Sequence, residues 1–151
     1  MSWNIKKPRH FDTLMNFTTE EINHLVDLSI KIKENEHNGI RPKNLAGKTL
    51  VGIFEKNSTR TANAAFKAAN YLGMQYFYNG PTGSNMGTKE SVADTANVFT
   101  EMYDIALFRT FGQDKIDSYA HHSRIPLING LSDQEHPTQT IADLQTIKAV
   151  Y

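Results

Sequence analysis

Four short apolar runs, separated by segments of helical periodicity, constrain the fold of this chain more than any other feature of its sequence. Such runs are typical of buried strands, and strands that alternate with helices form a mostly parallel sheet. The pattern predicts an α/β fold, a three-layer sandwich with a mostly parallel sheet of about four strands and helices on both faces. The predicted strands are 49–54, 74–78, 105–108 and 125–128, and the predicted helices between and after them are 61–72, 92–103, 114–121 and 137–151.

A further helix is predicted before the first strand. Thr18 and Glu21 have the spacing of a capping box, and apolar residues follow at helical spacing to about Glu34. A chain of 151 residues is long enough for one domain with its own core.

Composition excludes several classes of function. The chain is 39% hydrophobic and 10% aromatic, which is typical of a soluble, folded domain. Sixteen basic and sixteen acidic residues cancel, so no overall charge favours nucleic acid or an anionic membrane as partner. No apolar run approaches the roughly 20 residues that a membrane span needs. The absence of cysteine excludes disulfides, thiolate catalysis and cysteine-bound metal, and it fits a reducing cytoplasm.

The segment 58–61, Ser-Thr-Arg-Thr, follows the first predicted strand and begins a helix. In parallel sheets, ligands bind beyond the carboxyl ends of the strands. Hydroxyls, free backbone N–H groups and the Arg60 guanidinium at a helix N-terminus suit a phosphate dianion. Taken alone, the same residues are more typical of an ordinary helix cap with an exposed arginine.

Two further candidates follow the third and fourth predicted strands. Arg109 is either a second cation for the same anion or a surface arginine. His136 and Gln139 can donate to a carbonyl oxygen and hold an amide, although Pro137 also suits an ordinary capping turn. Because all three candidates follow strands of one predicted sheet, their combination favours a shared anion site.

Nucleotide and metal sites find less support. No Walker phosphate loop and no G-x-G-x-x-G follows a predicted strand. His121 and His122 are adjacent and point in different directions on a helix, so a solvated pair is favoured over a metal site.

Several motifs resemble those of the aspartate/ornithine carbamoyltransferase family. The segment 54–61 (FEKNSTRT) resembles the phosphate loop of these enzymes. The ornithine branch is the closer match, and the resemblance covers essentially the whole chain. The other segments that carry it are 136–139 (HPTQ) with 142–144 (ADL), 80–84 (GPTGS), 87–91 (GTKES), 94–96 (DTA) and 108–113 (FRTFGQ).

The resemblance implies the N-terminal, carbamoyl-phosphate-binding domain of a cytoplasmic trimer. The enzyme would convert carbamoyl phosphate and ornithine to citrulline and phosphate, or the reverse in arginine catabolism, without a metal or organic cofactor. Arg60, Arg109 and His136 would be catalytic: Arg109 would bridge phosphate and carbonyl oxygen, and His136 would donate to that oxygen. Gln139 would orient the carbamoyl amide. The implied binding residues for carbamoyl phosphate or phosphate are Ser58, Thr59, Arg60, Thr61, Arg109, His136, Pro137, Thr138 and Gln139.

Two positions depart from the family pattern. The family usually has a second arginine where this chain has Ala62. Its long loop, here 79–89, usually offers a glutamine to the neighbouring subunit's site, where this chain has Asn85; Lys89 would reach the same site. A lost charge and a shorter side chain both predict weaker anion binding.

The resemblance also bears on domain organisation. Residues 1–151 are expected to form the carbamoyl-phosphate-binding domain, to end within the inter-domain helix, and to lack the amine-binding domain that would select ornithine over putrescine. A degenerate, non-catalytic relative with a binding or assembly role is the main alternative. A nucleotide-binding regulatory domain is a third, which rests on fold class alone.

Overall fold

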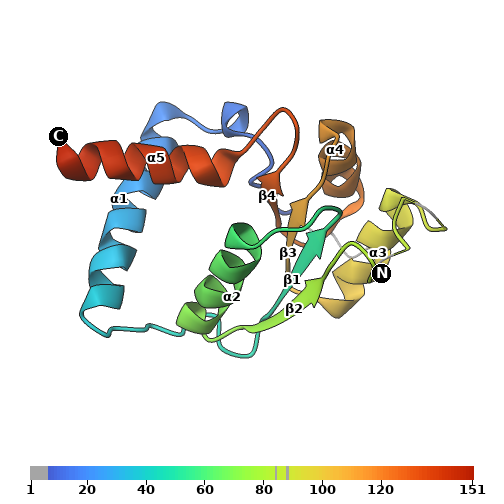
Figure 1. The fold of residues 1–151 in the computed structure, drawn as a ribbon, viewed down its shortest axis with the longest axis horizontal. Helices are drawn as coiled ribbons and strands as arrows, with labels where there is room; N and C mark the ends of the chain where they lie inside the picture. The colour runs from blue at the N-terminus through green and yellow to red at the C-terminus, as the bar shows by residue number, and fades with distance from the viewer. Residues whose placement is uncertain (1–6, 84, 88) are drawn as a thin grey trace.

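A parallel sheet forms the centre of the molecule in the computed structural model, which describes residues 7–83, 85–87 and 89–151 (Figure 1). The described strands lie in the order β2-β1-β3-β4, with every neighbouring pair parallel. This is the sheet that the sequence predicts. The strands are β1 (Thr49–Phe54), β2 (Gln75–Asn79), β3 (Ile105–Arg109) and β4 (Leu127–Leu131).

Helices connect the strands and cover both faces of the sheet. Figure 1 shows α1 and α5 crossing at one side of the molecule, where they contact each other. No described helix has both the length and the apolar character that crossing a membrane would require. The helices are η1 (Leu14–Asn16), α1 (Thr19–His37), α2 (Arg60–Leu72), α3 (Val92–Met102), α4 (Gln113–His122) and α5 (Pro137–Val150).

Alternate side chains of β1 divide the core into two parts, because successive residues of a strand point to opposite faces. Val51 and Ile53 pack with residues of α3 and α4 on one face. Leu50 and Phe54 pack with Ala65 and other residues of α2 on the opposite face. Strand β1 is therefore buried on both faces from Leu50 to Phe54, as expected for a central strand of a parallel sheet, whereas the edge strand β2 is largely exposed.

Local sequence signals fix several helix ends. The Thr18 side chain accepts from the Glu21 N–H, and the Glu21 side chain accepts from the Thr18 N–H, so the predicted capping box is confirmed. Gly73, with φ 79°, ends α2 in the left-handed conformation that glycine adopts without steric cost. Pro137 occupies the first turn of α5, as predicted.

The largest differences from the predicted element boundaries lie at the ends of α1 and β4. Helix α1 continues to His37, three residues past the predicted end, and Asn38 caps it. Strand β4 was predicted to end at 128, but it continues to Leu131 through a register irregularity opposite Phe108 and Arg109. The polar Asn129 hid this continuation, although its side chain is fully buried and hydrogen-bonded to the Asp12 carbonyl and the Leu131 N–H.

The strand order places a topological switch point between β1 and β3. From β1 the chain moves outward to β2, then crosses back to β3 on the other side of β1. In open α/β sheets, the crevice beyond the carboxyl ends of two such strands is where ligands bind. The loops after Phe54 and Arg109 border this crevice, since these two residues are register partners.

Candidate functional site

Three strand ends lie side by side at the carboxyl edge of the sheet. Phe54 of β1 pairs with Arg109 of β3, and Arg109 pairs with Leu131 of β4. The loops that follow these residues carry the three predicted site segments, 58–61, Arg109 and 136–139. The prediction that they share one edge of the sheet is confirmed.

The N-terminus of α2 has no side-chain cap. Thr59 occupies the N-cap position in a helical conformation, and its side chain accepts no hydrogen bond from the first turn. The first backbone N–H groups of a helix have no partner within the helix and carry a partial positive charge. The Ser58 hydroxyl is buried next to them and has no hydrogen-bond partner among the described residues. The loop thus presents donors suited to an anion.

Arg109 joins β3 to this helix end. Its Nη1 donates to Thr61 Oγ1 at 2.9 Å, and its backbone carbonyl accepts from the Glu55 N–H at 3.0 Å. Its Nε is buried and unpartnered within the described chain. A half-buried guanidinium with a spare donor, fixed beside an uncapped helix N-terminus, is the arrangement that binds phosphate groups.

His136 occupies the N-cap position of α5, again without a side-chain cap. Burial lowers the pKa of the His136 imidazole below its usual 6.5, the positive charge of Arg109 lowers it further, and Asp143 opposes both. The imidazole is therefore neutral at pH 7, where one ring nitrogen donates and the other accepts. Arg109 acts on the His136 pKa and also donates to Thr61, so the three residues belong to one cluster.

The remaining residues of the segment 136–139 belong to the first turn of α5. Pro137 is buried and Thr138 is half-buried. Gln139 is exposed, and its Nε2 donates to Asp143 Oδ1 at 2.9 Å, which leaves its carbonyl oxygen able to accept. The Asp143 carboxylate thus orients Gln139 and also acts on the His136 pKa.

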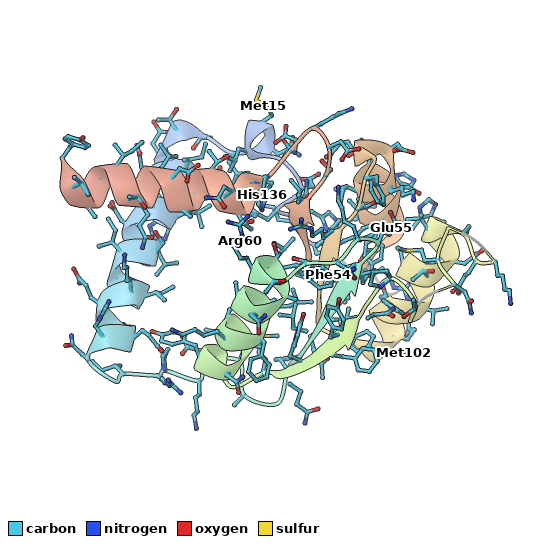
Figure 2. The ribbon with its side chains drawn as sticks, viewed as in Figure 1. Met15, Phe54, Glu55, Arg60, Met102 and His136 are labelled. Atoms are coloured by element: carbon cyan, nitrogen blue, oxygen red, sulfur yellow. The ribbon has the colours of Figure 1, made fainter. Side chains whose placement is uncertain are left out.

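Arg60 and His136 begin α2 and α5, and Figure 2 shows the two labelled residues at neighbouring ends of these helices. Arg60 is exposed and forms no ion pair with a described carboxylate. Two uncapped helix N-termini, two arginines and a neutral imidazole can hold a phosphate and stabilise negative charge on an adjacent carbonyl oxygen. No three described His, Asp or Glu side chains gather as a metal site.

The long loop lies apart from α5, projecting at the right of the view in Figure 1. Asn85 and Lys89 are exposed, and the Lys89 N–H donates to the Asn85 carbonyl at 3.0 Å. Met86 between them is buried in the core with residues of β1 and α3, so the loop is anchored to its own domain. Ser84 and Thr88, which belong to the loop motifs named above, lie outside the described residues.

A second polar cluster at this edge was missed by sequence reasoning. The Glu55 carboxylate accepts hydrogen bonds from the buried Thr110 hydroxyl and from Lys115 Nζ. Lys56 Nζ reaches Asp133 at 3.2 Å and lies 4.4 Å from the centre of the Phe111 ring. The signal that identified Arg109, a polar residue directly after a buried strand, applies equally to Glu55.

Comparison with known proteins shows the family to which the chain belongs. The family model described as aspartate/ornithine carbamoyltransferase, carbamoyl-P binding domain matches residues 9–149. The chain is 49% identical over 144 residues to the catabolic ornithine carbamoyltransferase of Malacoplasma penetrans, covering 94% of this chain and 42% of that protein.

Solved structures show the same fold. The anabolic ornithine carbamoyltransferase of Campylobacter jejuni superposes with a TM-score of 0.85 at 38% identity, covering 94% of this chain and 45% of the other. A mitochondrial ornithine carbamoyltransferase from Coccidioides immitis superposes with a TM-score of 0.90 at 32% identity, covering 96% and 47%. The chain thus spans less than half the length of these relatives. By its sequence and its fold, it belongs to the aspartate/ornithine carbamoyltransferase family, through the carbamoyl-P binding domain.

Proposed function

We propose that this chain binds carbamoyl phosphate, or phosphate, in the crevice between β1 and β3, as its share of an ornithine carbamoyltransferase reaction. The observation that carries the proposal is the contact of Arg109 with Thr61 at the uncapped N-terminus of α2. The buried donors of Ser58 and Arg109, which have no hydrogen-bond partner among the described residues, support it, because native proteins rarely bury polar groups without a partner.

Each predicted residue then has a defined task. The hydroxyls of Ser58, Thr59 and Thr61, with the first N–H groups of α2, hold the phosphate. Arg60 and Arg109 neutralise its charge, and Arg109 also reaches the carbonyl oxygen.

The start of α5 holds the carbamoyl end. Pro137 and Thr138 shape this turn, and the Gln139 carbonyl oxygen accepts from the carbamoyl amide. Attack by an amine on the carbonyl carbon builds negative charge on the carbonyl oxygen. The neutral His136 donates to that oxygen. As the C–N bond forms, the C–O bond to phosphate breaks, and phosphate, held by the arginines, leaves with the proton that the amine nitrogen loses.

The amine is held elsewhere in this proposal. The match to the Malacoplasma penetrans enzyme covers 42% of that protein, and we assign ornithine binding to a region outside the match. Positioning two reactants is worth up to roughly 7–11 kcal/mol of a reaction barrier. The 151 residues alone should therefore bind the anion and form no citrulline. Residues 1–151 act as one carbamoyl-phosphate-binding domain in this scheme.

Assembly as a homotrimer also belongs to the proposal, with Asn85 and Lys89 offered to a neighbouring subunit's site. Exposed aromatic and apolar side chains support a self-association surface, because large apolar side chains on a surface are typical of interfaces. The large exposed hydrophobic side chains of α2, β2 and α3 are Phe66, Phe77, Tyr78, Val98 and Met102.

We also propose a cytoplasmic location for the protein, which cell fractionation would test.

A degenerate, non-catalytic relative is the second candidate, and Ala62 and Asn85 are the observations that favour it. Isothermal titration of the chain with carbamoyl phosphate and with inorganic phosphate separates the two. The enzymatic proposal expects saturable binding of both anions, weakened in Arg109→Met. Absence of binding at millimolar concentrations would favour the degenerate relative. Citrulline formation at the rate of a full-length relative would refute the assignment of the amine site to another region.

A further inference from the structure

A partly buried ion pair lies at the same edge of the sheet as the anion site. Glu55 directly follows β1, and its side chain is only 14% exposed. Lys115, in the first turn of α4, donates to both carboxylate oxygens of Glu55, at 2.8 Å to Oε1 and 3.0 Å to Oε2. The two residues are 60 positions apart, so the pair links separate parts of the chain. Figure 2 shows Glu55 close to α4.

The same carboxylate is tied to the residue that follows Arg109. The hydroxyl of Thr110, which is fully buried, donates to Glu55 Oε2. The backbone N–H of Glu55 donates to the carbonyl of Arg109 at 3.0 Å. Glu55 therefore contacts two consecutive residues at the end of β3, the backbone carbonyl of Arg109 and the side-chain hydroxyl of Thr110.

The pair also lies against the long loop. A Cβ built on Gly87 would lie 3.6 Å from Glu55 Oε1 and 3.7 Å from Lys115 Nζ. Glu55, Gly87 and Lys115 line a cavity of about 230 Å³ at this edge, together with Met86 and Phe111. The Gly87 N–H donates to the Glu90 carbonyl at 2.7 Å, so Gly87 has a backbone hydrogen bond where it meets the pair.

We propose that Lys115 is a positioning residue for the anion site: by pairing with Glu55 it fixes Arg109 against the 55–59 loop and seats the long loop at Gly87. The inference deepens the proposed function and rests on it. Neither Glu55 nor Lys115 contacts the anion in this scheme. Their effect is indirect, because donors held in place by hydrogen bonds to surrounding residues bind better than mobile ones.

Lys115→Met removes the charge and keeps the length of the side chain. We expect its dissociation constant for inorganic phosphate, measured by isothermal titration, to rise roughly tenfold, since small displacements of site residues have effects of this order. Lys115→Arg restores the charge and should return the constant close to that of the unmodified chain. Rescue by arginine distinguishes a charge that positions Glu55 from simple packing.

The matched control is Lys148→Met. Lys148 also forms an ion pair, with Asp27 at 2.6 Å, but this pair is exposed and joins α5 to α1. This variant should bind phosphate like the unmodified chain. If Lys115→Met fails to fold because Glu55 is left unpaired, the double variant Glu55→Gln/Lys115→Met removes both charges and carries the same expectation.

Amide hydrogen exchange at Gly87, measured without ligand, is the second readout. We expect exchange about tenfold faster in Lys115→Met than in the unmodified chain, and unchanged in Lys148→Met and Lys115→Arg. Should Lys115→Met match Lys148→Met in both measurements, the inference is overturned. If the unmodified chain binds neither phosphate nor carbamoyl phosphate, the proposed function fails, and Gly87 exchange alone then decides whether Lys115 holds the loop.

Discussion

Arg109 Nη1 donates a hydrogen bond to Thr61 Oγ1 at 2.9 Å, across 48 positions of the chain. The contact joins the end of β3 to the first turn of α2, on the two sides of the topological switch point. It places a half-buried guanidinium beside a helix N-terminus that the side chain of its N-cap residue, Thr59, does not cap. Repulsion between the cation and the positive helix end is relieved when an anion binds between them.

Replacing Thr61 with valine keeps the shape of the side chain and removes its hydroxyl. Arg109 then loses its acceptor and the site loses one proposed donor, so phosphate affinity should fall by about 1.5–3 kcal/mol, the range for a hydrogen bond with a charged partner. Isothermal titration measures the change. Thr146→Val is the control, because its hydroxyl donates to the Ala142 carbonyl on the exposed face of α5. Equal affinities in the two variants would contradict the role of Thr61.

Arg60→Ala tests the exposed cation of the site. The side chain is exposed and forms no ion pair among the described residues. Without anion, the free energy of unfolding should therefore change by no more than the roughly 0.5 kcal/mol typical of a surface substitution. Phosphate at about 100 times its dissociation constant should stabilise the unmodified chain by roughly 2.7 kcal/mol. Most of this stabilisation should disappear in Arg60→Ala when thermal unfolding is followed with and without phosphate.

Arg41→Ala removes another exposed arginine, one that pairs with Glu36 at 3.3 Å. The response to phosphate should be intact in this variant. A loss of the response in both variants would show that it reports general charge and not a site.

Ala62→Arg restores the second arginine that the family pattern has at this position. Ala62 is half-buried in the first turn of α2, next to Thr61. We expect phosphate binding to tighten about tenfold, or about 1.4 kcal/mol, because a further cation reaches the anion. Without anion the chain should be slightly less stable, since a positive charge at a helix N-terminus is unfavourable.

Asn70→Arg adds the same charge to the same helix eight residues later, about 12 Å along its axis. Phosphate affinity measured by titration should be unchanged in this control. Tightening in both variants would point to net charge, and tightening in neither would show that Ala62 does not limit binding.

The sequence predicts those site residues whose position depends on the order of strands and loops along the chain. Arg60, Arg109 and His136 follow apolar runs, and a parallel sheet brings the ends of such runs to one edge whatever the details of packing. The pair of Glu55 with Lys115 depends on how α4 packs on the sheet, which no local pattern encodes. The end of β4 was missed for a similar reason: buried Asn129 satisfies its polar groups through contacts with distant residues such as Asp12.

The surroundings of His136 predict opposite changes of its pKa in two variants. Burial and the charge of Arg109 lower the pKa of this imidazole below 6.5, whereas Asp143 raises it. Arg109→Met should therefore raise the His136 pKa towards its usual value, and Asp143→Asn should lower it further. Imidazole chemical shifts followed by NMR as a function of pH measure both changes. A shift in the same direction in the two variants would contradict the arrangement at the start of α5.

The lowered pKa of His136 also makes the free energy of unfolding depend on pH. Well above pH 6.5 the imidazole is neutral in the folded and in the unfolded chain, so it adds no pH dependence there. As the pH falls below 6.5, the unfolded chain binds a proton that folded His136 resists, and the free energy of unfolding decreases until the pH passes the folded pKa. Arg109→Met should raise the folded pKa of His136 and so reduce the pH range over which the free energy of unfolding decreases. Bound phosphate, with its negative charge beside the imidazole, should raise the His136 pKa and reduce the loss of stability, which urea unfolding at pH 5.5 and 7.5 with and without phosphate would measure.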